Sequence, residues 1–142
     1  MIAGGTGITP MIQAIHAILG EDASSRSTEK VTLLYGSQNS DDILGETMLS
    51  HWSSQYKSIF DVTHVLSNEK EDSAATKRED VKLGFINREI ISESFPGPEE
   101  DVMIFVCGPP PMYNALCGPR DRPELTGLLA EMGYKAEQVY KF

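Results

Sequence analysis

The chain has 142 residues, of which 40% are hydrophobic and 23% are charged. These proportions are ordinary for one soluble globular domain with a sizeable core, and they argue against wholesale disorder. The formal net charge is −9, and the 12 lysines and arginines are scattered along the chain. Because a phosphate backbone needs a concentrated basic face, we expect no nucleic-acid partner.

The sequence also argues against a membrane-spanning segment and against a metal site. No apolar stretch approaches the roughly 18 residues of a membrane-spanning helix, so we expect no membrane segment in this chain. The three histidines are far apart and have no metal-ligand spacing with either cysteine, so we also expect no metal site. Cys107 and Cys117 both lie near proline and glycine turns, which gives little support to a disulfide between them.

Apolar segments bounded by turn residues predict the strands. The first is a short strand at 1–3, directly before a glycine loop. The most apolar segment is "VMIFVCG", which is typical of a strand that is covered on both faces. In chain order the predicted strands are residues 1–3, 30–37, 58–67, 102–108 and 138–142.

Helix patterns alternate with these strands. The first helix is predicted to have Thr9 as its cap and Pro10 in its first turn, and to stop at Gly20. The next is predicted to begin at Asp41 or Asp42. The later ones follow the cap Asn87 and begin near Pro123, so the further helices are residues 41–52, 87–95 and 123–133.

The order of strands, helices and loops along the chain predicts the fold class. Residues 68–82 are almost all charged or small and polar, and we expect them to form a solvated loop. Strands that alternate with helices through short turns predict an open, parallel α/β sheet of about five strands, with helices on both faces. In such sheets ligands bind outside the carboxyl ends of the strands.

The loop "AGGTGITP" follows the first strand and opens the first helix. Glycines at such a turn let the backbone approach a pyrophosphate at a helix N-terminus. The pattern is Gly5-x-Gly7-x-x-Pro10, however, and it lacks the third glycine of the dinucleotide fingerprint. The second strand also ends at Gly36 and Ser37, without the acidic residue that holds a ribose. On this motif alone, a glycine-rich turn without a ligand stays open.

The segment "CGPPPM" ends the most buried predicted strand. Gly108 lets a flat ligand approach the backbone, and the three prolines that follow predict a rigid shelf. From the residues alone Cys107 can be read as a nucleophile or as an inert thiol that ends a strand. The nucleophile is disfavoured, because no histidine neighbours Cys107 in the sequence.

Four motifs together resemble the NADH-binding lobe of NADH-cytochrome b5 reductases, which belong to the wider ferredoxin-NADP reductase-like group. They are "GGTGITPM" at 4–11, "DIL" at 42–44, "CGPPPM" at 107–112 and the terminal "VYKF". The resemblance covers essentially the whole chain and implies the C-terminal, NADP-linked domain of that group, with residues 1–142 as one pyridine-nucleotide-binding domain. It implies an oxidoreductase that passes hydride from NADH to FAD and then single electrons to cytochrome b5.

The resemblance also implies the site residues. Cys107 would be the catalytic residue that orients the nicotinamide. The cofactor-binding residues would be Gly4, Gly5, Thr6, Gly7, Thr9, Pro10, Gly36, Cys107, Gly108, Pro109, Pro110, Met112 and Phe142. FAD would be held mainly by an N-terminal barrel that is missing here, so we expect an N-terminally truncated lobe that is inactive alone.

The tail "ELTGLLAEMGYKAEQVYKF" resembles the mitochondrial, fungal-type branch of the family. This implies a place at the mitochondrial outer membrane or intermembrane space, with the endoplasmic reticulum membrane or the cytoplasm as alternatives. The chain departs from the family where an acidic residue commonly follows the third strand, because Ser67 and Asn68 stand there, and where Gly45 and Glu46 follow "DIL". NADH preference is therefore left open.

Two other functions remain. The chain could be the matching lobe of a nitrate reductase or of another fused flavin-haem reductase, whose C-terminal modules are very similar. It could also be a nucleotide-binding module without turnover.

Overall fold

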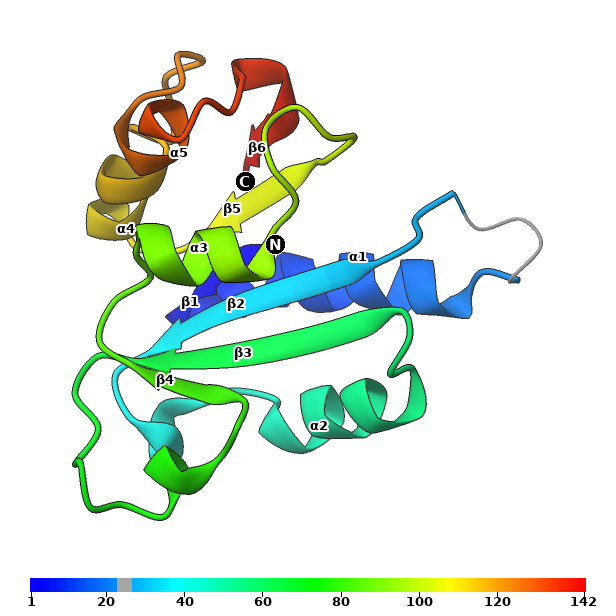
Figure 1. The fold of residues 1–142 in the computed structure, drawn as a ribbon, viewed down its shortest axis with the longest axis vertical. Helices are drawn as coiled ribbons and strands as arrows, with labels where there is room; N and C mark the ends of the chain where they lie inside the picture. The colour runs from blue at the N-terminus through cyan, green and yellow to red at the C-terminus, as the bar shows by residue number, and fades with distance from the viewer. Residues whose placement is uncertain (23–26) are drawn as a thin grey trace.

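A computed structural model describes residues 1–22 and 27–142. They form a six-stranded parallel sheet in the order β4-β3-β2-β1-β5-β6 (Figure 1). The strands are β1 (Ile2–Gly4), β2 (Val31–Ser37), β3 (Phe60–Leu66), β4 (Val81–Leu83), β5 (Ile104–Cys107) and β6 (Val139–Lys141). The predicted open, parallel α/β sheet is confirmed, although the expected number of strands was one too few.

The additional strand is β4, at the edge of the sheet. Its first two residues lie in the segment 68–82, which was predicted to be a polar loop, and a strand of three residues is too short to show a clear pattern in the sequence. Among the described strands β4 pairs only with β3, and its side chains are half-buried or exposed, as an edge strand allows. The preceding segment also contains a short 3-10 turn, η3 (Ala75–Lys77).

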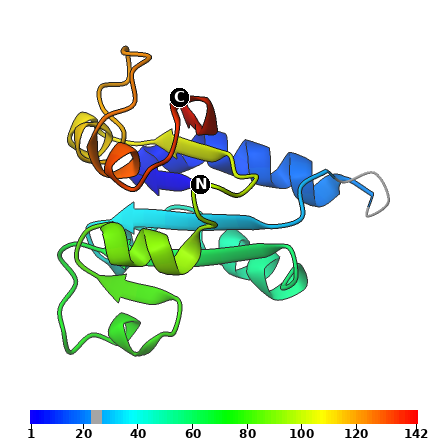
Figure 2. The same ribbon diagram turned by 45° about the horizontal axis from the view of Figure 1, so that its top comes forward.

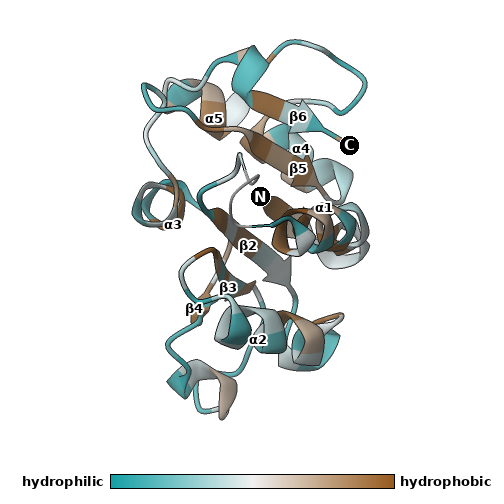
Figure 3. Cartoon of the chain, turned by 90° about the vertical axis from the view of Figure 1, so that its right-hand side faces the viewer, coloured by the Kyte–Doolittle hydropathy of each residue, from teal (hydrophilic) through white to brown (hydrophobic). Residues whose placement is uncertain are grey.

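Helices cover both faces of the sheet, as predicted. They are α1 (Ile8–Gly20), α2 (Glu46–Gln55), α3 (Arg88–Ser94), α4 (Pro110–Leu116) and α5 (Gly127–Glu131). Figure 2 turns the sheet to show α1 behind it and α3 in front, and Figure 3 shows α1 and α2 on one side and α3 and α5 on the other. The shorter 3-10 turns are η1 (Gly5–Gly7), η2 (Ser40–Asp42) and η4 (Ala136–Gln138).

Each face of the sheet has its own hydrophobic core. Apolar residues of α1 recur at helical spacing and pack with residues of β2 and α2 on one face; the most buried are Ile8, Met11, Ile15, Leu33, Tyr35 and Leu49. The opposite core joins α3, α4 and α5 to the sheet, through Ile2, Leu34, Ile91, Val106, Tyr113, Leu116 and Leu129. Burial of each large aliphatic side chain contributes about 1.5–3 kcal/mol.

The start of α1 differs from the prediction. Thr9 is not the cap: Gly7 occupies the cap position and Ile8 is the first helical residue. The hydroxyl of Thr9 instead donates a hydrogen bond to the carbonyl oxygen of Thr6, at 3.0 Å. The reason is that the 3-10 turn η1 leads directly into α1, so the helix begins before the residue with the better capping side chain.

The start of α2 was also predicted too early. Asp41 and Asp42 belong to η2, where the side chain of Asn39 accepts a hydrogen bond from the backbone N–H of Asp41. Gly45 then adopts a φ of 71°, a left-handed conformation that separates η2 from α2. The Gly45-Glu46 pair, which departs from the resembled family, therefore marks the real beginning of this helix.

The C-terminal half gives one confirmation and two corrections. Asn87 caps α3 as predicted, since its side chain accepts a hydrogen bond from the N–H of Ile90 at 3.0 Å. The prolines after Cys107 form the first turn of α4, a helix that was not predicted, because proline fits the first helical positions. The helix predicted at 123–133 is only α5, which Gly127 begins with a φ of 70°.

The topology places all strand ends at one edge. The chain passes from β1 to β2 on one side and later returns to β5 on the other, so β1 and β5 form the switch point of the sheet. In the register, Gly4 lies beside Gly36, Ala3 beside Cys107, and Ser37 beside Leu66. The glycine loop and the Cys107 segment are thereby brought together at the carboxyl edge.

Candidate functional site

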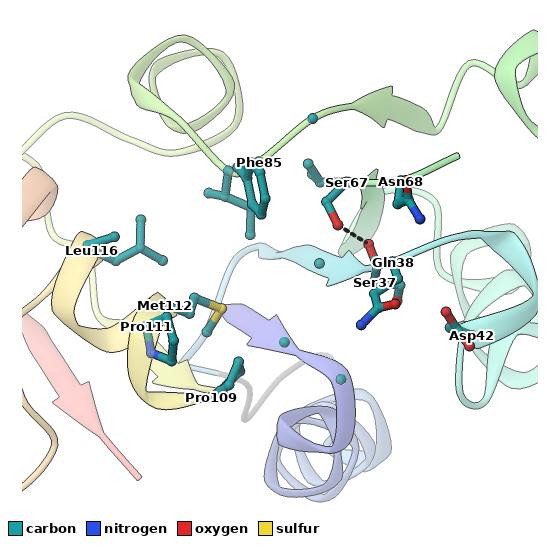
Figure 4. A pocket seen from close by; sticks show the side chains of 17 residues that line it. Ser37, Gln38, Asp42, Ser67, Asn68, Phe85, Pro109, Pro111, Met112 and Leu116 are labelled. Carbon is teal, nitrogen blue, oxygen red and sulfur yellow. Dashed lines mark hydrogen bonds between the residues drawn. The ribbon is translucent and has the colours of Figure 1, made fainter. Parts of the chain in front are cut away.

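A cleft of about 830 Å³ lies along the carboxyl ends of β1 to β5 (Figure 4). This volume is within the range of ligand pockets, roughly 300–1,000 Å³. Residues from five separate chain segments line it: Gly4, Gly5, Gly36, Ser37, Gln38, Asp42, Val65, Ser67, Asn68, Gly84, Phe85, Ile86, Pro109, Pro111, Met112, Ala115 and Leu116. Its position at the switch point is where ligands bind in open α/β sheets.

One side of the cleft, which we call the packed edge, consists of residues 4–7 and 107–112. Here a side chain at any of three glycines would meet another atom, which is backbone at Gly7 and the end of the Met112 side chain at Gly4 and Gly108. A Cβ added at Gly7 would lie 2.2 Å from the carbonyl oxygen of Cys107, and one added at Gly108 would lie 2.3 Å from Cε of Met112. At Gly4 it would lie 2.7 Å from Sδ of Met112. The loops after β1 and β5 therefore pack directly on each other.

Gly5 is different, because it faces open space. It has a φ of 53°, and no atom would lie within 4 Å of an added Cβ. It lines the cleft immediately before α1, a helix of 13 residues with no acidic side chain in its first turn. The positive end of the helix dipole is thus not neutralised by its own side chains, which favours an anionic group beside Gly5.

The other side of the cleft, the open edge, comprises residues 36–42, 67–68 and 84–86. Its polar side chains follow β2 and β3, and Figure 4 shows Ser37, Gln38, Ser67 and Asn68 along this side. Backbone hydrogen bonds join the two strand ends: the N–H of Ser67 donates to the oxygen of Ser37 at 3.0 Å, and that of Asn68 to Gln38 at 2.7 Å. This edge can offer hydroxyl and amide groups to a sugar or a base.

The open edge also includes one aromatic side chain, that of Phe85. Phe85 follows β4, lines the cleft and is 77% exposed, which is unusual for a large apolar residue. Its ring offers a flat face for stacking with a planar ligand. Phe85 was not predicted from the sequence, because the strand that presents it was read as the end of a loop; the apolar "LGFI" directly after that loop was the available signal.

Asp42 brings a carboxylate to the open edge, and its turn is tied to the segment after β3. The carboxylate of Glu69 accepts a hydrogen bond from the N–H of Ser40 at 2.6 Å. Hydrogen bonds from Ser40 hold the pKa of Glu69 below its usual value. Among the described residues that line the cleft, Asp42 alone carries a charge.

The predicted site residues fall into two groups. Five of them line the cleft: Gly4, Gly5, Gly36, Pro109 and Met112. The others support it or lie beside it: Gly7 and Gly108 are contact points of the packed edge, whereas Thr6, Thr9, Pro10, Pro110, Cys107 and Phe142 are not among the lining residues.

Cys107 is a half-buried free thiol at the end of β5. Its side chain packs at the margin of the core on the α1 face, as do Phe105 and Phe142.

Two further titratable groups, Tyr113 and Cys117, lie in α4 and directly after it. The pKa of Tyr113 is raised to about 12, mainly by burial and to a lesser extent by the neighbouring Cys107. The hydroxyl of Tyr113 lies 2.7 Å from the carbonyl oxygen of Phe142, so it ties α4 to the end of the chain. Cys117 is also free but buried, and burial raises the pKa of its thiol.

The comparison with known families agrees with this geometry. Residues 1–118 match the family described as "Oxidoreductase NAD-binding domain". The chain belongs to this family of oxidoreductase NAD-binding domains.

Among similar proteins are those named NADH-cytochrome b5 reductase 2. The one from Neurospora crassa is 42% identical over all of this chain, and the one from Saccharomyces cerevisiae is 38% identical. The chain spans 40% of the length of the Neurospora protein and 46% of the yeast protein.

Solved structures give the same likeness. The cytochrome b5 reductase domain of Ulva prolifera nitrate reductase matches all of this chain with a TM-score of 0.78 and 26% identity, over 48% of that structure. The CS-b5R domains of human Ncb5or, in their NAD+ form, match 98% of this chain with a TM-score of 0.73 and 25% identity, over 34% of that structure.

The cleft fits a dinucleotide. Gly5 leaves room for a close backbone approach at a helix N-terminus, Phe85 offers an exposed ring, and the volume is sufficient for an elongated ligand. In the described part of the chain, no group of three or more His, Cys, Asp or Glu side chains is placed to hold a metal ion. None of the described helices is long and apolar enough to cross a membrane.

Proposed function

We propose that this chain is the NADH-binding lobe of an NADH-cytochrome b5 reductase. The observation that carries the proposal is the cleft at the β1–β5 switch point, where the glycine loop meets the Cys107-Gly108-Pro109 segment. The dinucleotide would lie along the carboxyl ends of the strands, with its pyrophosphate beside Gly5 and the start of α1. The similarity to proteins named NADH-cytochrome b5 reductase 2 supports the reaction class.

The two edges would have different tasks. The open edge would bind the adenosine half through Phe85 and the polar groups after β2 and β3, and the packed edge would hold the nicotinamide half against Gly108 and Pro109. Cys107 would pack beside the nicotinamide and limit its orientation, as a positioning group and not as a nucleophile. FAD, held mainly by another lobe, would accept the hydride and release electrons singly to cytochrome b5.

The lining of the cleft favours NADH over NADPH. The additional phosphate of NADPH needs a cationic partner, and no lysine or arginine is among the described lining residues. Asp42 would also repel that phosphate. Replacing Asp42 with asparagine should therefore strengthen NADPH binding about threefold while changing NADH binding less, as measured by calorimetric titration of both nucleotides. Equal effects on the two nucleotides would count against a role in discrimination.

A mitochondrial location, at the outer membrane or in the intermembrane space, is part of the proposal. It is supported by the tail "ELTGLLAEMGYKAEQVYKF" and by similarity to the fungal reductases. The endoplasmic reticulum membrane and the cytoplasm are the alternatives that cell fractionation would distinguish.

A second candidate is the matching lobe of a nitrate reductase. It is favoured by the TM-score of 0.78 with the Ulva prolifera reductase domain, although the identity of 26% is lower than the 42% with the Neurospora protein. A haem or molybdenum domain upstream in the native protein would favour this candidate. A nucleotide-binding module without turnover is the remaining alternative.

The test joins this chain to its native upstream sequence and loads the product with FAD. Stopped-flow mixing with NADH should bleach the flavin absorbance, and addition of cytochrome b5 should restore it while the haem is reduced. Flavin reduction without transfer to cytochrome b5 would favour a different acceptor. NADH binding without flavin reduction would favour the module without turnover, and lack of NADH binding would overturn the proposal.

A further inference from the structure

Tyr35 connects the two edges of the cleft without lining it. The residue lies near the carboxyl end of β2 and is fully buried. Its hydroxyl donates a hydrogen bond to the carbonyl oxygen of Gly5 at 3.1 Å, and it accepts one from the backbone N–H of Leu44 at 3.3 Å. One side chain thus joins the glycine loop to the segment between η2 and α2.

The hydrogen bond from Tyr35 affects how the carbonyl oxygen of Gly5 is placed relative to an anion in the cleft. The carbonyl oxygen of Gly5 also accepts the N–H of Ile8, the first residue of α1. A carbonyl oxygen has two lone pairs, and here both are engaged by groups of the protein. An oxygen held in this way is directed into the protein, so it does not repel a phosphate that approaches Gly5 from the cleft.

The bond to Leu44 acts on the other edge. Leu44 follows η2, which carries Asp42 at the lining of the cleft, and it precedes Gly45 with its left-handed backbone. The side chain of Leu44 is exposed, so packing of that side chain does little to hold the segment. The N–H bond to Tyr35 is therefore one of the attachments that place Asp42 relative to Gly5.

The hydroxyl of Tyr35 is itself held firmly. Its ring packs in the core on the α1 face, and the ring of His64 lies 5.9 Å away, centroid to centroid, at an angle of 54°. Burial raises the pKa of Tyr35, so the group remains a neutral hydroxyl that can donate and accept at the same time.

We propose that Tyr35 is a positioning residue for the dinucleotide: its hydroxyl fixes the Gly5 carbonyl and the Leu44 amide, and so sets the pyrophosphate-binding loop relative to the open edge. This role rests on the proposed function of the cleft. Loss of the hydroxyl would loosen both attachments while keeping the ring in the core.

The test compares Tyr35→Phe with Tyr134→Phe. Tyr134 is a matched control, because its hydroxyl is also largely buried and donates to a backbone carbonyl, that of Pro96 at 2.7 Å, and it does not line the cleft. Both variants should lose similar amounts of stability in urea unfolding. NADH titration of the 142-residue chain should show binding about five- to tenfold weaker for Tyr35→Phe and unchanged within about twofold for Tyr134→Phe.

Hydrogen exchange provides a second measurement, which starts from the wild-type chain. In the wild-type chain the amide of Leu44 should be protected, and NADH should increase this protection. In Tyr35→Phe the same amide should exchange faster, whereas Tyr134→Phe should leave it unchanged.

The outcomes separate the two claims. Equal NADH affinity for Tyr35→Phe and the wild type, or an equal loss in both variants, would overturn the role of Tyr35 and leave the proposed function standing. A wild-type chain that binds no NADH would overturn the proposed function and this role with it. Protection of Leu44 that NADH does not change would overturn the link between the two edges.

Discussion

The two edges of the cleft are built by different physical means. At the packed edge the backbones of two loops touch, and an added Cβ at Gly4, Gly7 or Gly108 would lie within 2.7 Å of another atom. At the open edge the side chains after β2, β3 and β4 surround space, and Phe85 is largely exposed. At the packed edge, close contacts leave no room for larger side chains at these glycines. At the open edge, side chains that face the cleft supply the groups that a ligand can contact.

Substitutions at the two edges should therefore have different effects. Enlarging a glycine that touches the other loop at the packed edge should affect stability and binding together, because the added Cβ would push the two loops apart. A change to an exposed side chain of the open edge, such as Phe85, should affect binding alone, because exposed side chains contribute little to the free energy of unfolding. The following substitutions test that separation, from the largest expected effect to the smallest.

Gly7→Ala should be the most damaging. The new Cβ would lie 2.2 Å from the oxygen and 2.5 Å from the carbonyl carbon of Cys107, and backbone cannot move aside as a flexible side chain can. We expect a loss of about 3 kcal/mol in the free energy of unfolding, measured by urea denaturation, together with weaker NADH binding. Gly20→Ala is the control, because no atom lies within 4 Å of a Cβ there. Equal stability of the two variants would contradict the close contact.

Phe85→Ala should separate binding from stability. The ring is exposed, so unfolding should change by less than about 0.5 kcal/mol. If the ring stacks on the base, NADH binding should weaken by about 1–2 kcal/mol, measured by calorimetric titration. Leu83→Ala is the control, since Leu83 is also exposed but is not among the lining residues. The same NADH affinity in both variants would remove Phe85 from the site.

His64→Leu tests the support beneath the open edge. His64 is fully buried in β3, and neither ring nitrogen has a hydrogen-bond partner in the described part of the chain. An apolar replacement should therefore be neutral or stabilise the fold by up to about 1 kcal/mol at pH 7.

The pH dependence of His64→Leu has a definite sign. Burial, as the largest cause, lowers the pKa of His64 from its ordinary value of 6.5, while the charges of Asp80, Arg78 and Glu46 act on it in opposing directions. Below pH 6.5 the unfolded chain takes up a proton that folded His64 resists, so the wild type loses stability as the pH falls. Urea unfolding from pH 7.5 to 5 should show a shallower loss for His64→Leu. Parallel curves would contradict this account.

Cys107→Ser should have the smallest effect on affinity. The residue is not among those that line the cleft, so NADH binding to this chain should change by less than about twofold. In the extended, FAD-loaded protein the rate of hydride transfer should fall several-fold, because the positioning of the nicotinamide changes. Stopped-flow reduction of the flavin measures that rate. Unchanged kinetics would leave Cys107 as an inert thiol at a strand end.

The packed edge was the more predictable of the two from the sequence. Only glycine and proline satisfy its close contacts and fixed turns, so "GGTGITP" and "CGPPP" carry a strong signal. The open edge uses residue types that occur in any polar loop, and nothing in Gln38, Ser67 or Asn68 marks them as neighbours. Their proximity follows from the register of β2 with β3, which only the folded sheet provides.

The errors in the predicted helix starts and in the number of strands have a similar origin. The cap of α1 and the beginning of α2 were misplaced because side-chain preference favoured Thr9 for the first and Asp41 or Asp42 for the second, whereas the 3-10 turns η1 and η2 precede the helix starts. The short strand β4 was missed because pairing at a sheet edge needs little apolar pattern. Tyr35 was read simply as part of a buried strand, since its hydrogen bonds span 30 and 9 residues of sequence.

The most direct test of the central claim is an NMR titration of the 15N-labelled 142-residue chain with NADH. A dinucleotide that spans both edges should shift the amides of residues 4–8 and 107–108 at the packed edge, and those of residues 36–38, 67–68 and 84–86 at the open edge, with one saturation curve. Shifts confined to one edge, or concentrated at residues 27–32 near the opposite ends of the strands, would contradict the account.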